Sequence, residues 1–326
     1  MHAAFYELNG SARDVLRLGE VDLPMPAAGE VRVRLKTSGV NPSDVKSRTG
    51  VVRKMAFPRV IPHSDGAGVV DAVGEGVAAE RIGQRVWIWN AQWLRPSGSA
   101  AEYVVLPAGQ AVPLPAHISD VAGACLGIPA MTAWHAVTKY GPVTGKTLLI
   151  SGGAGAVSHY AIQIAKAGGA TVLTTISSAE KAALALAAGA DLAINYRTED
   201  VAAVVKERTN GRGVDVVIEL DLAANARLLP GVLRPKGKVV AYGTSSMEAS
   251  IPAFFCLLNG ISIDFFLVYT LDPGERAAAI DGITRLLEAD ALIHNIAATL
   301  PLDAIVAAHE LVESGKAVGN VVMLID

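Results

Sequence analysis

Hydrophobic and polar residues follow different periods in the two halves of the chain. Up to about residue 120, short runs with the alternation of β-strands are separated by Gly and Pro, as at 31–35, 68–73 and 101–105. From about residue 130, apolar strand-like runs alternate with segments of helical period, which is typical of a parallel α/β sheet. The pattern therefore predicts a β-rich domain followed by a doubly wound α/β domain.

Six strands are predicted in the second half, a number that fits a doubly wound sheet. They are expected at residues 147–151, 171–176, 192–195, 214–219, 238–243 and 261–266. The last of these is apolar, and we expect it to lie at the edge of the sheet. Because an exposed apolar edge can pair with a second copy, a homodimer is the predicted assembly. The alternative is a strand covered by the chain's own helices.

Helix signals fall between these strands. A helix is expected over 156–167, and Ser177 with Glu180 is predicted to form a capping box for the next helix, which ends before Gly189. The tail predicts a helix at 274–288, a strand near Ile296, a helix at 303–314 and a strand at 320–325. A length of 326 residues suits two domains. We place the β-rich domain at 1–122 and 292–326, and the α/β domain at 123–291.

A glycine-rich turn follows the first strand of the α/β half. Gly153 and Gly155 match the first two glycines of a G-x-G-x-x-G turn, and Ser158 replaces the third. The first glycine permits the tight turn, the second lets a pyrophosphate approach the backbone, and the helix start holds the phosphates. We expect Ser158 to displace the helix slightly without losing the site. The alternative is an α/β turn that binds nothing.

The end of the second strand indicates which dinucleotide is bound. An NAD site carries Asp or Glu there, about 20 residues past the turn, to accept a hydrogen bond from the ribose 2′-hydroxyl. This chain has residues 174–178, Thr-Thr-Ile-Ser-Ser, with no carboxylate. A 2′-phosphate can be accepted by Ser177, Ser178 and Lys181, so NADPH is the predicted cofactor. Lys181 taken alone is equally consistent with a solvated helix residue.

Composition excludes several other function classes. The net charge of -3 and a pI near 6.2 give no basic field, so nucleic acid is not expected as a partner. No uncharged apolar run approaches the roughly 18 residues of a membrane span, and no membrane association is expected. The N-terminus shows no signal-peptide pattern, which predicts a cytoplasmic protein. Only Cys125 and Cys256 are present, both expected as small buried hydrophobes.

Several short motifs, taken in order and spacing, resemble a known family. They are 38–45 with Arg48 and Gly50, 62–70 followed by 73–77, 83–86, 161–166, 188–191, 194–197 and 315–322. The chain is similar over nearly its whole length to the medium-chain dehydrogenase/reductase superfamily, specifically to its zinc-free quinone oxidoreductase branch of zeta-crystallin-like proteins. The resemblance implies that the β-rich domain is GroES-like and that the α/β domain is a Rossmann fold. The final helix and strand would close the β-rich domain over the nicotinamide.

The resemblance also bears on zinc. Zinc-dependent members of the superfamily carry Cys where this chain has Asn41, and His where it has Ser64. Neither substitute is a plausible Zn²⁺ ligand, and the lobe of four cysteines that binds structural zinc is missing. A zinc-independent protein is therefore predicted, with no metal ligands. We expect His63, one residue from the lost ligand position, to have a structural or hydrogen-bonding role.

Site residues follow from the same resemblance. Asn41 is expected in the cleft near the nicotinamide as the catalytic residue, and Asp44 is expected to organise its loop through backbone hydrogen bonds. Their alternative is an Asx-turn beside Pro42. Substrate contacts are expected from Asn41, Lys46, Arg48 and Val52. Cofactor contacts are expected from Gly153, Ala154, Gly155, Ala156, Val157, Ser177, Ser178, Lys181, Tyr196, Gly243, Thr244, Ser245, Phe266, Leu267, Val268 and Asn320.

Some residues depart from the family pattern. The family often has aromatic residues at the positions of Lys46 and Val52, which implies a more open or more polar acceptor pocket here. Glu219 and Asp221 lie in a stretch of the cofactor wall that usually carries one acid followed by Val-Gly. Tyr196 and Phe266 could each be core aromatics instead of cofactor contacts.

The predicted function is an NADPH-dependent, zinc-independent oxidoreductase that transfers hydride to a quinone. The cofactor supplies the hydride, while the protein orients and desolvates the reactants. No His/Asp or Ser/His pair is evident as a proton donor, so water or the ribose hydroxyl could serve. The nearest alternative is an enoyl or enone reductase acting on an α,β-unsaturated carbonyl. A more distant alternative is a non-catalytic NADPH-binding or RNA-binding protein, and the acidic pI argues against RNA.

Overall fold

Two compact units make up the chain. The computed structural model describes residues 1–51 and 54–325. One unit consists of Met1–Pro129 with Thr284–Asp326, and the other consists of Ala130–Ile283. These joins, at 129/130 and 283/284, lie seven and eight residues from the boundaries expected at 122/123 and 291/292. Among the described helices, none has the length and apolar character needed to cross a membrane.

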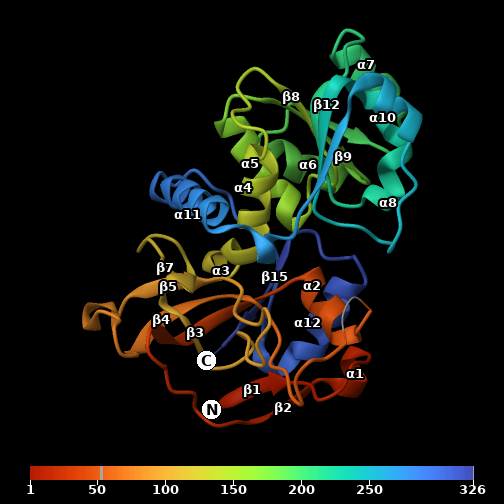
Figure 1. Cartoon of the computed structure of the whole chain (residues 1–326). Coiled ribbons are helices and arrows are strands. Elements are labelled where there is room, and N and C mark those ends of the chain that lie inside the picture. Colours follow the sequence, from red (N-terminus) through yellow and green to blue (C-terminus); the bar gives the residue numbers. More distant parts are fainter. Residues whose placement is uncertain (52–53, 326) are drawn as a thin grey trace. The chain divides into compact units, whose positions relative to one another are not determined.

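The α/β unit is built on a parallel six-stranded sheet, as predicted (Figure 1). Its strand order is β10-β9-β8-β11-β12-β13, which is the 3-2-1-4-5-6 order of dinucleotide-binding folds. The chain changes direction across the sheet between β8 and β11, so this pair marks the topological switch point. The strands are β8 (Thr147–Ile150), β9 (Thr171–Ile176), β10 (Leu192–Asn195), β11 (Val214–Glu219), β12 (Leu233–Ala241) and β13 (Ser262–Phe265).

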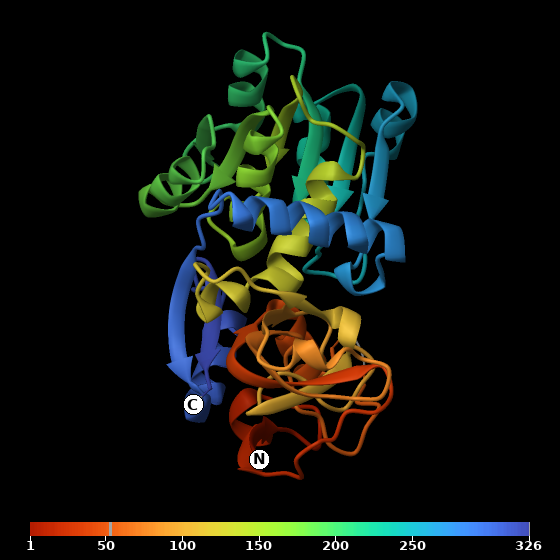
Figure 2. The same cartoon turned by 90° about the vertical axis from the view of Figure 1, so that its left-hand side faces the viewer.

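Helices connect these strands, and they are seen from a second side in Figure 2. The predicted helix at 156–167 is found with these bounds. The predicted capping box is wrong by one residue, because Ser178 and not Ser177 is the N-cap, and its hydroxyl accepts from the backbone N–H of Lys181 at 3.3 Å. The helices are α4 (Met131–Thr138), α5 (Ala156–Ala167), α6 (Ala179–Ala187), α7 (Val201–Arg208), α8 (Leu222–Asn225), α9 (Leu229–Val232), α10 (Ala253–Asn259) and α11 (Pro273–Glu288).

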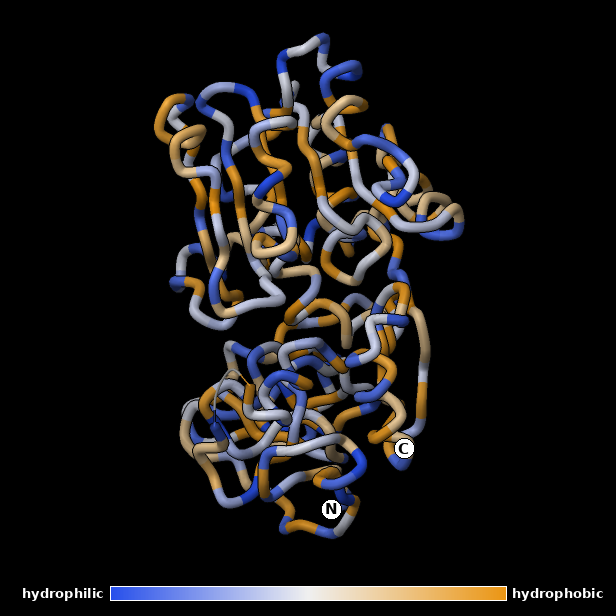
Figure 3. Tube along the Cα trace, turned by 90° about the vertical axis from the view of Figure 1, so that its right-hand side faces the viewer, coloured by the Kyte–Doolittle hydropathy of each residue, from blue (hydrophilic) through white to orange (hydrophobic). Residues whose placement is uncertain are grey.

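The core of the α/β unit lies along its central strands. Every residue of β11 is buried, and Leu149, Val217 and Val239 of neighbouring strands belong to one apolar cluster. The hydrophobic stretches of these strands stand out in Figure 3. Such near-continuous apolar runs are expected where helices cover both faces of a parallel sheet. The carboxyl ends of the strands therefore have a rigid base.

The β-rich unit contains a seven-stranded sheet whose path is β14-β15-β3-β4-β5-β7, with β6 paired to β3. Strands β1 and β2 form a separate antiparallel pair. The C-terminal β15 pairs with β3, so the last strand of the chain joins a sheet with strands from the first third of the chain. The strands are β1 (His2–Phe5), β2 (Arg17–Glu20), β3 (Glu30–Val40), β4 (Asp65–Val73), β5 (Arg85–Ile88), β6 (Tyr103–Pro107), β7 (Ala111–Pro113), β14 (Ile296–Pro301) and β15 (Asn320–Leu324).

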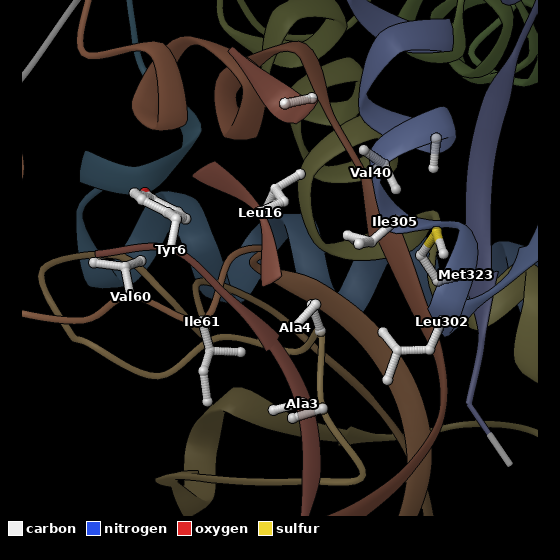
Figure 4. Packing of buried hydrophobic residues seen from close by; sticks show 14 of the residues in the cluster. Ala3, Ala4, Tyr6, Leu16, Val40, Val60, Ile61, Leu302, Ile305 and Met323 are labelled. Atoms are coloured by element: carbon white, nitrogen blue, oxygen red, sulfur yellow. The ribbon is translucent and has the colours of Figure 1, made fainter. Parts of the chain in front are cut away.

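The α-helices in the described part of this unit are α1 (Ala12–Val15), α2 (Pro42–Thr49), α3 (Asp120–Gly123) and α12 (Ile305–Glu313). Figure 4 shows how residues from both ends of the chain pack together, including Ala4 and Tyr6, Val40 of β3, Ile305 of α12 and Met323 of β15. This shared core holds α2, which begins directly after β3, in a fixed position.

Candidate functional site

The turn between β8 and α5 has the local geometry of a phosphate-binding loop. Gly152 has a φ of 69°, so it is Gly152 and not Gly153 that supplies the left-handed backbone of the turn. A Cβ on Gly153 would overlap the Thr174 side chain of β9, so this glycine is needed for close packing. A Cβ on Gly155, the N-cap of α5, would meet only the Gly152 oxygen, at 3.2 Å. The first turn of a 12-residue helix begins at this glycine, and the start of a helix favours an anion.

Ser158 accounts for the missing third glycine. Its side chain is buried, and the hydroxyl donates to the Ser151 carbonyl at 2.7 Å and lies 3.1 Å from the Tyr242 hydroxyl. These bonds satisfy the extra polar group inside the packed turn. They also connect α5 to the ends of β8 and β12. The loop keeps its form with serine at this position.

The ends of β9 and β10 carry hydroxyls and cations. Ser177 and Ser178 follow β9, and Lys181 lies in the first turn of α6. Asn195 of β10 pairs with Ile176 of β9, so Arg197 follows at the same edge of the sheet. Arg197 was not predicted as a site residue, although a cation placed just after a strand end was a signal available in the sequence. Together these groups can hold a 2′-phosphate.

Tyr196 is 54% exposed, which excludes the alternative of a core aromatic. Phe266 is half-buried and packs against the His135 ring with centroids 4.5 Å apart. Burial lowers the pKa of His135, so the ring beside Phe266 is held neutral. Leu267 is exposed and Val268 is buried in the same segment. In residues 266–268, the Leu267 side chain is thus exposed, whereas the Phe266 and Val268 side chains are packed against the protein.

Carboxylates connect the loops that follow β8, β11 and β12. The buried Glu219 accepts from the Ser151 hydroxyl at 2.6 Å, from the Asp221 N–H at 2.6 Å and from the Asn225 side chain at 2.9 Å. Ser151 and Glu219 therefore bridge the two strands of the switch point. Asp221 in turn accepts from the backbone N–H and the hydroxyl of Ser245, at 2.9 and 3.0 Å.

The loop after β12 lies close to the loop after β11. A Cβ on Gly243 would overlap the Leu220 carbonyl, so this position requires glycine. Thr244 and Ser245 follow it on the exposed side. The Ser245 hydroxyl donates a hydrogen bond to Asp221. No local sequence pattern predicted this contact. The predicted residues 153–157, 177–178, 181, 196 and 243–245 thus lie at the carboxyl edge of one sheet.

Asn41 is the N-cap of α2 in the β-rich unit and is nearly buried. Its side-chain Nδ2 donates to Asp65 at 2.8 Å, and its backbone N–H donates to Asp44 at 2.8 Å. The expectation that Asp44 organises this loop through a backbone hydrogen bond is confirmed. Burial raises the pKa of Asp44 to about 7 and raises that of Asp65 well above its usual range. Asn41 is therefore held between two carboxyl groups that burial favours in the neutral form.

Lys46 and Arg48, two of the predicted acceptor contacts besides Asn41, differ in burial. Lys46 is exposed on α2. Arg48 is fully buried, and its guanidinium donates to Glu313 at 2.7 Å and to the Gly10 carbonyl at 2.6 Å. Arg48 joins α2 to α12. Its predicted contact with the acceptor is corrected, because no part of its side chain is accessible. Val52 lies outside the described residues.

His63 has the hydrogen-bonding role that the sequence suggested. One ring nitrogen is 2.8 Å from the Ser38 hydroxyl, and the other is 3.0 Å from Nε2 of His309. Ser64 is buried. Across the described ranges, no three His, Cys, Asp or Glu side chains form a cluster that could hold a metal ion. Asn41 and Ser64 therefore belong to no such cluster among the described residues.

Asn320 opens β15 in the β-rich unit. Its side chain donates to the Asn295 carbonyl at 3.0 Å, and its backbone N–H donates to the same oxygen at 2.8 Å. The side chain is buried. Asn320, Asn41 and Lys46 thus belong to one unit, while the remaining predicted cofactor residues belong to the other.

Comparisons with known proteins match both units. Residues 27–116 match the family model of the alcohol dehydrogenase GroES-like domain. Residues 156–285 match the family model of zinc-binding dehydrogenase. The β-rich unit is therefore GroES-like, and the fold class predicted from the sequence is confirmed.

Individual relatives cover nearly the whole chain. A 2-haloacrylate reductase of Burkholderia sp is 31% identical over 318 residues, covering 94% of this chain and 93% of the relative. The structure of an NAD-dependent alcohol dehydrogenase superposes with a TM-score of 0.90 at 31% identity and covers all of both chains. The Escherichia coli quinone oxidoreductase complexed with NADPH gives a TM-score of 0.87 at 26% identity, covering 99% of this chain and 100% of the other.

Proposed function

We propose that this chain, which belongs to the medium-chain dehydrogenase/reductase superfamily and to its quinone oxidoreductase branch, is an NADPH-dependent, zinc-independent reductase of a quinone. The observation that carries the proposal is the glycine turn of α5 together with an acid-free, cation-bearing end of β9. The E. coli relative named above is a quinone oxidoreductase with NADPH bound, which supports this cofactor.

The chain's own residues have distinct roles in this proposal. The 153–157 turn and the start of α5 hold the pyrophosphate, and Ser177, Lys181 and Arg197 hold the 2′-phosphate. The 243–245 loop and residues 266–268 would line the nicotinamide half. NADPH, when bound, supplies the hydride. Asn41, kept in one orientation by Asp65, and Lys46 are the proposed acceptor contacts, with Asn41 as the catalytic residue.

An activated alkene is the second candidate acceptor. The Burkholderia relative is a 2-haloacrylate reductase, so a close relative is named for reduction of an unsaturated acid. An α,β-unsaturated carbonyl accepts hydride at carbon and then needs a proton. A quinone also needs a proton after hydride transfer. The same cofactor site would therefore serve either substrate.

Oxidation of NADPH by the purified protein, measured against quinones, enones and enoyl thioesters, tests the proposal. We expect turnover with quinones to exceed turnover with the other two classes. A higher kcat/KM for enones or thioesters would replace the proposed acceptor with the alternative. Absence of turnover with all three would contradict the proposed reductase. Metal analysis belongs to the same experiment, since stoichiometric zinc in active protein would contradict zinc independence.

Replacement of Lys181 by Ala is expected to weaken NADPH binding about tenfold and to leave NADH binding almost unchanged. The reason is the loss of one charge-assisted hydrogen bond to the 2′-phosphate, worth about 1.5 kcal/mol at an accessible site. Titration of each cofactor by fluorescence measures the two dissociation constants. Lys206→Ala, at the end of α7, is the matched control. A wild type that prefers NADH would contradict the cofactor assignment.

We further propose a homodimer formed through β13 and α10. Strand β13 ends the order of the parallel sheet, so within the described sheet one of its edges is unpaired. Phe265 on this strand is 68% exposed, and Phe254, Leu257 and Leu258 of α10 are similarly exposed. An exposed apolar surface beside an open strand edge favours pairing with a second copy.

The expected solution mass is twice the 33.8 kDa of the chain. Leu257→Asp places a charge in the proposed interface and is expected to shift the protein to the monomer, as measured by sedimentation or light scattering. Leu186→Asp, at an exposed apolar residue of α6, is the control and should leave the mass unchanged. A monomeric wild type would contradict the proposed homodimer.

A further inference from the structure

Charged side chains lie on both sides of the switch point at the carboxyl edge of the parallel sheet. Lys181 and Arg197 follow β9 and β10, on one side of the switch point. Glu219 ends β11 and Asp221 follows the strand, on the other side. Within the described ranges neither carboxylate forms an ion pair. Carboxylates also lie on the β9 and β10 side, where Glu180 is in the first turn of α6 and Asp200 is the N-cap of α7. What distinguishes the β11 side is therefore the fixed position of its carboxylate.

Asp221 is held rigidly with one carboxylate oxygen free. Its Oδ1 accepts from the Ser245 N–H, the Ser245 hydroxyl and the Ala224 N–H, at 2.9, 3.0 and 3.3 Å. Among the residues that the structure describes, no group donates to its Oδ2. Glu219 reinforces the arrangement, because it accepts from the Asp221 N–H at 2.6 Å. The loop thus fixes the position of a carboxylate without neutralising it.

The oxidised and reduced forms of the cofactor differ in charge at the nicotinamide end. In this fold the ribose carrying the 2′-group lies at the end of the second strand, here β9, so the other half lies beyond the switch point, towards β11 and β12. The nicotinamide ring is neutral in NADPH and positively charged in NADP⁺. A fixed carboxylate on the β11 side stabilises only the charged ring.

We propose that Asp221 sets the preference of the site between the two redox forms of the cofactor, by favouring NADP⁺ relative to NADPH. The inference rests on the proposed function, since it needs a dinucleotide in this crevice. Asp221 is a specificity-determining residue in this proposal. By stabilising the positive charge that forms when hydride leaves, it favours reduction of the acceptor and also makes the site more sensitive to inhibition by the oxidised product.

Asp221→Asn separates charge from geometry. The Asn side chain keeps an acceptor oxygen for Ser245 and Ala224 but carries no charge. Titration with NADP⁺ and with NADPH, without any acceptor, gives the ratio of the two dissociation constants. We expect the variant to lose about threefold in NADP⁺ affinity relative to NADPH, an effect that shrinks at high salt. An unchanged ratio in Asp221→Asn would overturn the proposal.

Two further variants show whether a change in the ratio of dissociation constants comes from the charge of Asp221. Asp200→Asn is the matched control, because Asp200 is also a helix N-cap carboxylate but follows β10, on the other side of the switch point. Its ratio should equal that of the wild type, and an equal change in both variants would contradict a local role for Asp221. Ser245→Ala retains the charge of Asp221 but removes one hydrogen bond to it. This variant should therefore weaken the binding of NADP⁺ and NADPH alike. A wild type that binds neither form would refute the proposed function itself.

Discussion

Replacement of Asp44 by Asn is expected to stabilise the protein at pH 8 and to have little effect at pH 4. Asp44 is buried beside Asn41, and this burial raises its pKa from 3.8 to about 7. Asn presents the same kind of acceptor oxygen to the Asn41 N–H, so the hydrogen bond that organises the start of α2 is kept. The variant therefore removes the titration while preserving the local structure.

The sign follows from proton binding in the two states. Near pH 4 the unfolded chain begins to lose the Asp44 proton, whereas the folded chain keeps it until about pH 7. Between these values the folded state binds more protons, so the wild type loses stability as the pH rises. A pKa difference of about 3, at about 1.4 kcal/mol for each pKa unit, gives an upper value of about 4 kcal/mol. Burial raises the pKa of Asp65 as well, so the stability of the variant should still fall with rising pH.

Urea denaturation at pH 4, 5, 6, 7 and 8 measures this effect. Tryptophan fluorescence is suitable because Trp87, Trp89 and Trp93 all belong to the β-rich unit. Asp303→Asn removes an exposed carboxylate of the same unit and is the control. The stability curves of the wild type and Asp44→Asn should diverge with rising pH. Parallel curves would show that Asp44 does not carry a raised pKa.

Glu313→Ala is expected to destabilise the β-rich unit by about 3 kcal/mol, more than Arg48→Met does. Arg48 has 0% exposure and Glu313 has 45%. Removal of Glu313 leaves a buried guanidinium that, among the described residues, donates only to the Gly10 carbonyl, and its Nε donates no hydrogen bond. An uncompensated buried charge is strongly destabilising. Removal of Arg48 leaves a carboxylate that water can solvate, and Met fills part of the vacated volume.

The urea midpoint of each variant at pH 7 tests this order. Glu310→Ala, which breaks an exposed ion pair between α12 and Arg13, is the control and should change stability by less than about 1 kcal/mol. The double variant Arg48→Met with Glu313→Ala should be more stable than Glu313→Ala alone, because no buried charge remains. If Arg48→Met proves the more damaging single change, the side chain contributes mainly through packing.

Local patterns predicted most of the elements. The helical period of 156–167 gave a helix with the observed bounds, and the apolar runs gave the strands of the parallel sheet to within a few residues. The capping residue was misplaced because Ser177 and Ser178 are both good N-caps. Only the direction in which the chain leaves β9 selects Ser178. The same limit applies to the tight turn, which was assigned to Gly153 but is made by Gly152, while Gly153 is needed for packing.

Contacts between distant residues could not be read from any pattern. Arg48 matches a family motif, yet its guanidinium binds Glu313, 265 positions away, and is closed off from any ligand. Asn41 was chosen for its position, but its pairing with Asp65 depends on the register of β3 against β4. Asp221 and Ser245 meet because two adjacent loops approach each other where Gly243 allows it.

The sequence by itself determined the two-part architecture, the dinucleotide turn and the acid-free end of β9, because each depends on residues within one strand, turn or helix. The tertiary structure decided which polar groups are accessible and which are used internally, since burial and hydrogen bonding are properties of the packed chain. That is why Arg48 changed from an acceptor contact into a buried link, and why Asp221 became visible as a fixed charge beside the cofactor crevice.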